Sequence, residues 1–196
     1  KTMPVSKILF ACKGTDDVKT IIEHMDKIKN KMPNHKIFTI VSNQKFGCMV
    51  NGVKMARGNF MKELRESDNA LIFHYDILSE GIDIDGITGV AIMRNMNQAK
   101  LLQTIGRAVR IYKANPKLKT QALVSVPVIN NNDETQAFVK DMVLAMRDGG
   151  FEINAENIIF AGDTNPGIAD DEDNEDQYHV DKKKKAQTTV QNVFHD

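Results

Sequence analysis

Residues 103–110 read Gln-Thr-Ile-Gly-Arg-Ala-Val-Arg, and the rest of the chain is organised around this stretch. We expect it to lie in a helix over residues 97–112, in which four apolar side chains share one stripe: Leu101, Ile105, Ala108 and Tyr112. Gln103, Arg107 and Arg110 then share the opposite face. The planar fork of an arginine can hold two phosphate oxygens, so this face is suited to a polyanion. The alternative is a surface helix whose charges are simply solvated.

The composition is that of an ordinary globular protein. The chain has 196 residues, of which 41% are hydrophobic and 27% charged, so it is long enough for one well-buried domain and a tail. Its formal net charge is zero, which argues against a general polycation but is compatible with a local basic surface. No apolar run reaches the ~20 residues needed to cross a bilayer, so we expect no membrane partner. Two cysteines provide no disulfide framework, and we therefore expect a cytoplasmic or other intracellular protein.

Strand-like and helix-like segments alternate along the chain. Short runs rich in Ile and Val predict strands over residues 7–12, 36–42, 69–75, 89–93 and 120–129, with a short last strand at 157–161. Apolar residues at helical spacing predict helices over residues 16–31, 59–66, 97–112 and 133–147. Residues 43–58 have little periodicity and are predicted to be mostly loop. This alternation indicates an α/β domain with a mainly parallel sheet over residues 1–162, followed by a charged, disordered or extended tail at 163–196.

Candidate functional residues gather where three of the predicted strands end. In an open parallel sheet, ligands bind at the carboxyl ends of the strands. Lys13 and Gly14 follow the first strand, residues 75–83 follow the third, and the arginine-bearing helix follows the fourth. Within residues 75–83, Gly81 permits a tight turn and the carboxylate of Asp83 suits a ribose hydroxyl. The alternative for this segment is a loop whose acidic residues cap a helix.

Two of these segments resemble known motifs when they are taken together. Residues 71–83 (Leu-Ile-Phe-His-Tyr-Asp-Ile-Leu-Ser-Glu-Gly-Ile-Asp) resemble motif V of superfamily-two helicases and translocases, and the pattern Gln103-x-x-Gly106-Arg107-x-x-Arg110 resembles their motif VI. A strand ending in Ile92-Met93-Arg94 lies between them, as in the family, and residues 7–13 resemble motif IV. The resemblance covers roughly residues 5–130, and its Ser-Glu-Gly-Ile-Asp segment is most similar to the restriction-enzyme and DNA-repair branches.

The resemblance implies the second RecA-like domain of a two-domain motor, with a mainly parallel sheet and helices on both faces. In such motors ATP binds in the cleft between the two domains. By position, Arg107 and Arg110 would be the arginine fingers that reach the γ-phosphate, and the other ATP-site residues would be Gly81, Asp83, Gln103 and Gly106. The expected nucleic-acid contacts are Lys13, Gly14, Tyr75, Asp76 and Arg94. Tyr75 departs from the family, because many members have a threonine there that touches the nucleic-acid backbone.

The phosphate-binding half of an ATP site is missing from the sequence. No G-x-x-x-x-G-K-[ST] segment occurs, and no spacing of His or Cys residues indicates a metal site. The resemblance therefore implies that ATP and Mg²⁺ are held mainly by an N-terminal RecA-like domain preceding Lys1, and that this chain does not hydrolyse ATP alone. The expected partners are that domain and DNA or RNA. The alternative function is a non-catalytic, doubly wound module that binds nucleic acid or another anionic partner.

Overall fold

The computed structural model describes residues 5–42, 47–75, 84–110, 122–126, 133–151 and 153. The chain divides into two compact units, Lys1–Pro127 and Val128–Asp196. In the described residues, the first unit contains a seven-stranded sheet with four helices, and the second contains helix α5 (Asp133–Asp148). The predicted last strand at 157–161 and the predicted tail at 163–196 lie outside the described residues.

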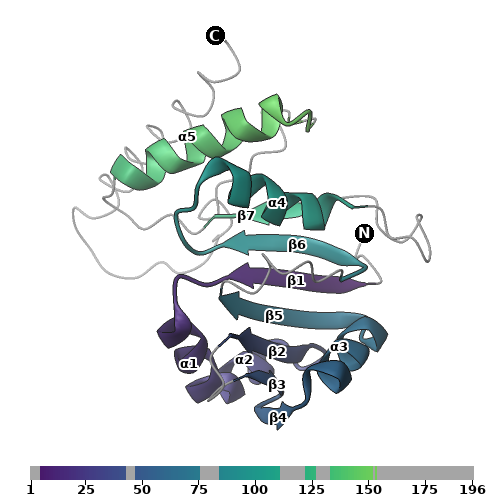
Figure 1. Ribbon diagram of the computed structural model, residues 1–196. Helices are drawn as coiled ribbons and strands as arrows, with labels where there is room; N and C mark the ends of the chain where they lie inside the picture. The colour runs from purple at the N-terminus through teal and green to yellow at the C-terminus, as the bar shows by residue number, and fades with distance from the viewer. Residues whose placement is uncertain are drawn as a thin grey trace, which may run out of the picture. The chain divides into compact units, whose positions relative to one another are not determined.

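The sheet of the first unit is mostly parallel (Figure 1). Its strands lie in the order β4-β3-β2-β5-β1-β6-β7. Their bounds are β1 Ser6–Ala11, β2 Lys36–Val41, β3 Cys48–Val50, β4 Val53–Met55, β5 Asn69–Tyr75, β6 Ile87–Ile92 and β7 Leu123–Ser125. Strands β2, β5, β1, β6 and β7 pair in parallel, as the alternation of strands and helices predicts. β5 enters between β1 and β2, so the first two strands are parallel without being neighbours.

Helices cover both faces of the sheet, and the alternation of side chains along β2 shows which helix covers which face. The helices are α1 Thr15–Glu23, α2 Met25–Lys31, α3 Arg57–Glu66 and α4 Gln98–Val109. Ile37 and Val41 of β2 belong to a buried cluster that includes residues of α1 and α2. Phe38, on the opposite face of the same strand, makes an edge-to-face contact with Phe60 of α3, with ring centroids 5.4 Å apart. The predicted α/β architecture is therefore confirmed.

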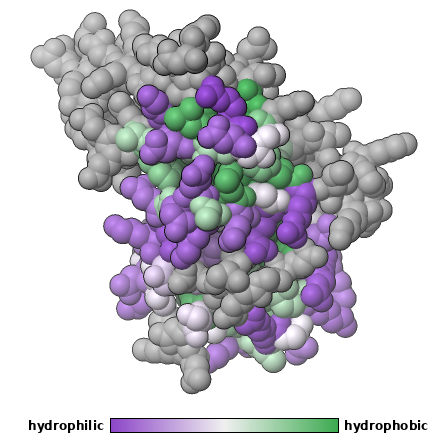
Figure 2. Space-filling view, turned by 45° about the horizontal axis from the view of Figure 1, so that its top comes forward, coloured by the Kyte–Doolittle hydropathy of each residue, from purple (hydrophilic) through white to green (hydrophobic). Residues whose placement is uncertain are grey.

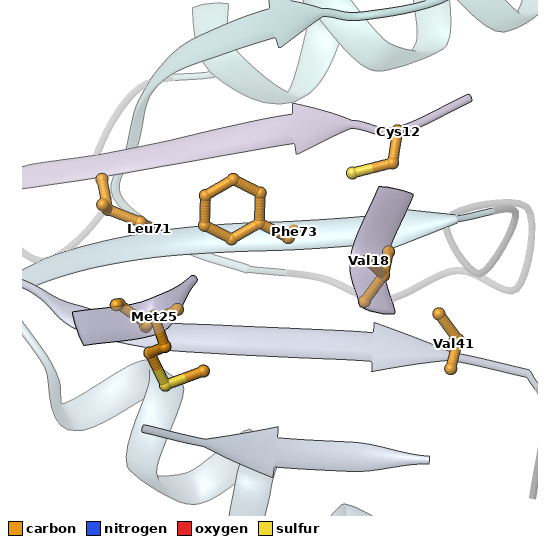
Figure 3. Close-up of a cluster of buried hydrophobic side chains, with 7 residues drawn as sticks. Cys12, Val18, Met25, Val41, Leu71 and Phe73 are labelled. Carbon is orange, nitrogen blue, oxygen red and sulfur yellow. The ribbon is translucent and has the colours of Figure 1, made fainter. Parts of the chain in front are cut away.

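Figure 3 shows the buried cluster that fixes α1 and α2 to the sheet. Its residues come from the end of β1, both helices and two further strands: Cys12, Val18, Met25, Ile37, Val41, Leu71 and Phe73. Phe73 also stacks on Phe10 of the neighbouring strand, with ring centroids 4.4 Å apart. Full burial of one large apolar side chain contributes roughly 1.5–3 kcal/mol, so the cluster as a whole holds α1 firmly beside the carboxyl ends of β1 and β5.

The predicted helix over residues 16–31 is two helices. α1 ends at Glu23, and His24 has φ −108° and ψ 18°, outside the α-helical region. The ring nitrogen Nδ1 of His24 lies 3.0 Å from the carbonyl oxygen of Thr20, which also accepts the backbone N–H of His24 at 3.0 Å. The N–H to Thr20 bond is the regular helical one, so the break lies in the backbone angles of His24, and a second helix begins at Met25.

Residues 43–58 were predicted to be mostly loop, and this prediction is wrong. Within them β3 and β4 form an antiparallel hairpin that extends the sheet from β2. The turn of the hairpin is Asn51-Gly52, with positive φ values of 50° and 84°. Two consecutive residues with positive φ are the mark of a type I′ turn, for which Asn-Gly is the strongest sequence signal. The dipeptide is visible in the sequence, but strands of three residues are too short to show an alternating pattern.

Helix α5 has nearly its predicted bounds, running from Asp133 to Asp148 against a predicted 133–147. Gly150 has φ 79° and its N–H donates to the Arg147 carbonyl, while the Phe151 N–H donates to the Met146 carbonyl. This pair of hydrogen bonds around a left-handed glycine terminates the helix, as the Gly149-Gly150 dipeptide indicates. Among the described residues, none of the helices is both long and apolar enough to cross a membrane.

Candidate functional site

β5, β1 and β6 are neighbouring central strands that end side by side (Figure 1). Their carboxyl ends form the carboxyl edge of the sheet, where the sequence predicts a ligand site. The Cys12 N–H donates to the His74 carbonyl at 2.9 Å, and the Met93 N–H donates to the Ala11 carbonyl at 3.2 Å. These hydrogen bonds continue the strand pairing to the last residues of the three strands. They therefore fix the backbone next to three of the predicted site residues: Lys13, Tyr75 and Arg94.

Tyr75 and Arg94 meet across the end of β1. The guanidinium carbon of Arg94 lies 5.2 Å from the centroid of the Tyr75 ring, within the range of a cation–π contact. Both side chains are half-buried. The sequence assigns both residues to one group of nucleic-acid contacts, and the structure brings them together, although no sequence pattern predicts the pair itself.

Lys13 and Gly14 lead from β1 into α1. The Lys13 side chain is exposed, and its backbone N–H donates to Oδ2 of Asp17 at 2.7 Å. Gly14 is the N-cap of α1 and has an extended backbone, with φ −161° and ψ 179°. A Cβ atom at Gly14 would meet no heavy atom within 4 Å. The described residues therefore leave space beside Gly14. Its extended backbone angles could be adopted by any residue and do not require a glycine.

Cys12 follows β1 directly, and its side chain is buried. Burial raises the pKa of its thiol to about 12; the Asp17 carboxylate adds to this rise, while the His74 backbone and Arg94 oppose it. The thiol is therefore protonated at neutral pH and is a poor nucleophile. Its role is to pack within the cluster of Figure 3.

α4 has a buried stripe where the sequence predicts one, and Gln103 and Arg107 lie outside that stripe. Oδ1 of its N-cap residue, Asn97, accepts the Lys100 N–H at 2.9 Å and satisfies the first turn. The buried residues form the predicted apolar stripe with one threonine added: Leu101, Thr104, Ile105 and Ala108. Gln103 is exposed and Arg107 is half-buried. A Cβ atom at Gly106 would meet nothing within 4 Å beyond its own helix, so the described residues leave this position open.

The helix predicted over residues 97–112 is shorter in the structure, which changes the relation between its two arginines. α4 ends at Val109, and Arg110 is its C-cap residue with φ −58° and ψ 139°. The predicted apolar residue Tyr112 lies outside the described residues. Arg107 is thus in the last helical turn, whereas Arg110 is the first residue beyond the helix and has a non-helical backbone. Helical spacing therefore does not place both guanidinium groups on one face, as the sequence had suggested.

The candidate residues form two groups rather than one. Lys13, Gly14, Tyr75 and Arg94 form the edge group; Gln103, Gly106, Arg107 and Arg110 form the α4 group. α4 begins beside the carboxyl end of β6 and runs back along the sheet (Figure 1). At a rise of about 1.5 Å per residue, Arg107 lies roughly 13 Å along the helix from Gln98. Asp76, Gly81 and Asp83, which were predicted to join these groups, lie outside the described residues.

A lysine near the start of β1, at the opposite end of the strands, is buried, which was not predicted from the sequence. Lys7 of β1 is 2% exposed, and its Nζ donates to the carbonyl oxygens of Arg65 at 3.2 Å and Asp85 at 3.4 Å. Burial lowers the pKa of Lys7, and the carboxylates of Asp68 and Asp85 partly offset this effect. The contact ties the end of α3 to the turn before β6. In sequence, a lysine at the start of a strand cannot be told from a solvated one.

Among the described residues, the remaining surface adds no third group of candidates. On the face that Figure 2 shows, hydrophobic residues are scattered among hydrophilic ones. The large hydrophobic residues that are exposed come from different parts of the first unit: Val53, Met93, Val109 and Leu123. In the ranges that the structure describes, no group of three or more His, Cys, Asp or Glu side chains could hold a metal ion.

A mostly parallel sheet covered by helices on both faces, with an arginine-bearing helix after β6, is the architecture of a RecA-like helicase C-terminal domain. The chain belongs to the helicase conserved C-terminal domain family, which it matches over residues 2–112, more than half of its length. The predicted family and fold class are thereby confirmed.

Three solved structures are similar to the chain at low sequence identity. The C-terminal domain of the DEAD-box protein Dbp5 has 18% identity and a TM-score of 0.49, covering 78% of this chain and 74% of that chain. A variant of the S. cerevisiae Dbp5 C-terminal domain, bound to a Gle1 variant and IP6, has 15% identity and a TM-score of 0.47 over the same shares, 78% and 74%. The ATP-dependent type ISP restriction-modification enzyme LlaBIII bound to DNA has 14% identity and a TM-score of 0.47, covering 74% of this chain and 10% of that chain. No curated protein matches the chain.

Proposed function

We propose that this chain is the C-terminal motor domain of an ATP-dependent nucleic-acid helicase or translocase, and that it supplies arginine fingers to an ATP site shared with an N-terminal RecA-like domain. Membership of the helicase C-terminal family supports the general role. The proposal of arginine fingers rests on one observation, the difference between the two sides of α4. Its apolar stripe is buried, while Gln103 is exposed, Arg107 is half-buried and Gly106 is open to a close approach.

In this proposal Arg107 and Arg110 act on the γ-phosphate. Phosphoryl transfer depends on positioning and on stabilising the developing negative charge, and an arginine finger contributes about 10³- to 10⁵-fold in rate. Arg107 is carried by the last turn of a packed helix, so its backbone is fixed; Arg110 follows the helix end. Gln103, one turn before Arg107, helps to set the cleft, and Gly81 and Asp83 contact the nucleotide near the ribose. ATP and Mg²⁺ are held mainly by the N-terminal domain.

The edge group, together with Asp76, contacts DNA or RNA in the same proposal. The position of Arg107 supports this assignment, because about 13 Å of helix lies between the start of α4 and the arginine proposed to reach the γ-phosphate. Lys13 offers an exposed ammonium group, and the space beside Gly14 admits a close approach of the strand backbone.

The test is alanine substitution of each arginine in the full-length protein. Arg107→Ala and Arg110→Ala are expected to lower nucleic-acid-stimulated ATP hydrolysis by about 10³-fold or more, with an unchanged unfolding midpoint. Arg57→Ala is the matched control, because Arg57 is an exposed arginine at the start of another helix. Unchanged turnover in both α4 variants would refute the arginine-finger role.

Strand-binding measurements on the same full-length protein, with and without ATP, distinguish this function from that of a non-catalytic binding module. A module binds a strand with strong salt dependence, and ATP changes neither its affinity nor its rate of release. A motor binds the strand with an affinity that depends on the nucleotide state. Salt-sensitive binding with no effect of ATP, in a protein that contains the N-terminal domain, would favour the module.

A further inference from the structure

We propose that the Arg94–Tyr75 pair is a stacking platform for one unpaired base of the bound nucleic acid. The inference rests on the proposed function, because it assumes a DNA or RNA strand at the carboxyl edge of the sheet. It adds the chemistry of the contact, which is made to a base and not to a phosphate.

The pair is built from two strands that are not neighbours. β1 lies between β5 and β6, so two interstrand steps of about 4.8 Å separate the backbones that carry Tyr75 and Arg94. The two side chains bridge this distance over the end of β1 and bring the guanidinium carbon to 5.2 Å from the ring centroid. Hydrogen bonds from the N–H groups of Cys12 and Met93 hold the three strand ends together. Strand pairing therefore holds the backbone that carries the two side chains in a fixed position.

The contact with Tyr75 holds a flexible side chain in place before a ligand arrives. Tyr75 is itself packed against the buried cluster of Figure 3, so its ring is a fixed support for Arg94. An arginine that is already ordered loses less conformational freedom on binding. Both residues are half-buried, so the pair keeps some contact with solvent at the sheet edge. Aromatic rings and guanidinium planes are the groups on which unpaired bases stack.

The charges around the pair favour a base over a phosphate. At the ends of β1 and β6 the positive charges of Lys13 and Arg94 are balanced by Asp16 and Asp17 in the first turn of α1. The formal charges of these four side chains sum to zero, so they give a phosphate no net attraction. Stacking on a base does not depend on such attraction, because the base is neutral.

The experiment compares two single strands of equal length, one normal and one made of abasic sites, on the full-length protein without ATP. Arg94→Ala is expected to weaken binding of the normal strand by about 5- to 150-fold, the range for the loss of one stacking contact. Its affinity for the abasic strand should equal that of the wild type. The slope of log K against log salt should not change, because the number of phosphate contacts stays the same.

Three variants control for folding and charge. Tyr75→Leu keeps an apolar side chain against the buried cluster but removes the ring, so it should reproduce the loss seen in Arg94→Ala. Tyr75→Phe keeps the ring and should bind both strands as the wild type does. Arg57→Ala removes an equal charge from the exposed start of α3 and should change neither affinity. Equal thermal unfolding midpoints show that all variants are folded.

Two results would overturn the stacking platform. A decrease of about 0.7 in the size of the salt slope for Arg94→Ala, with equal losses on both strands, would identify a phosphate contact. Unchanged affinity of both Arg94→Ala and Tyr75→Leu would show that the pair makes no contact. In either case the motor function stands if ATP hydrolysis still depends on Arg107 and Arg110. A full-length protein that binds neither strand would overturn the motor function itself.

Discussion

Replacing Ile105 with alanine tests whether the packing of α4 holds Arg107 in position. Ile105 is 0% exposed and lies on the buried stripe of the helix. The substitution removes three carbon atoms, which costs about 2.4 kcal/mol at about 0.8 kcal/mol per buried methylene. A residual cavity adds to this cost, and the better helix propensity of alanine offsets a few tenths of a kcal/mol. We expect the free energy of unfolding to fall by about 3 kcal/mol.

Urea unfolding followed by circular dichroism measures this loss, with an unchanged slope against urea concentration. Val109→Ala is the matched control, because Val109 lies on the same helix but is 39% exposed; its loss should stay below about 1 kcal/mol. In the full-length protein, Ile105→Ala should also lower ATP hydrolysis at temperatures where the fold persists, whereas Val109→Ala should not. A loss below about 1 kcal/mol for Ile105→Ala would refute the idea that this stripe docks α4.

Three further substitutions test the fold around the site. The unfolding free energy should rise as pH increases from the lowered pKa of Lys7 towards its unfolded value of 10.5, because the unfolded state binds more protons in that interval; urea titrations at several pH values should show that Lys7→Met removes this rise. Gly52→Ala forces a side chain into φ 84° and should cost about 1–2 kcal/mol, with faster hydrogen exchange in the hairpin but not in β1. Gly89→Ala places a methyl group 3.2 Å from Cβ and 3.3 Å from the carbonyl oxygen of Leu123, so the thermal unfolding midpoint should fall; an unchanged midpoint would show that β7 shifts without cost.

Buried parallel strands could be predicted from the sequence, but their neighbours could not. β5 has the predicted bounds of 69–75, because a strand buried on both faces is a continuous apolar run that ends at polar residues. The position of β5 between β1 and β2 depends on where each crossover returns to the sheet. That choice is made by the packing of helices on the two faces and leaves no local signal in the sequence.

Local features were missed where the backbone of one residue departs from a repeating pattern. The helix break at His24 lies in the backbone angles of a single residue, φ −108° and ψ 18°, and leaves no mark in the apolar spacing. The end of α4 at Val109 is of the same kind, since the apolar spacing alone continues to Tyr112. Periodicity predicts that a helix exists and which side is buried. It predicts the terminal residues less well, because capping contacts and tertiary contacts decide them.

For the candidate site as well, the residue types could be predicted from the sequence, but their arrangement could not. The resemblance to helicase motifs assigned Tyr75 and Arg94 to one function, but they are 19 positions apart in the chain. Their contact exists because β1 alone separates β5 from β6, which is a property of the sheet order. For the same reason, the sequence placed the arginines of α4 at the carboxyl edge with the other candidates. A helix that follows a parallel strand runs back along the sheet, and its last turn is carried away from that edge.

In the proposed motor, helix α4 connects the residues assigned to the two ligands. Arg94 lies three residues before Asn97, the N-cap of α4, and Arg107 lies in the last turn of the same helix. The helix between them is held by buried side chains on one stripe, so it moves as a rigid element. A strand bound at Arg94 and a γ-phosphate bound at Arg107 would then act on opposite ends of one body. A shift of α4 would therefore act on Arg107 at one end of the helix and on Arg94, three residues before its N-cap, at the other.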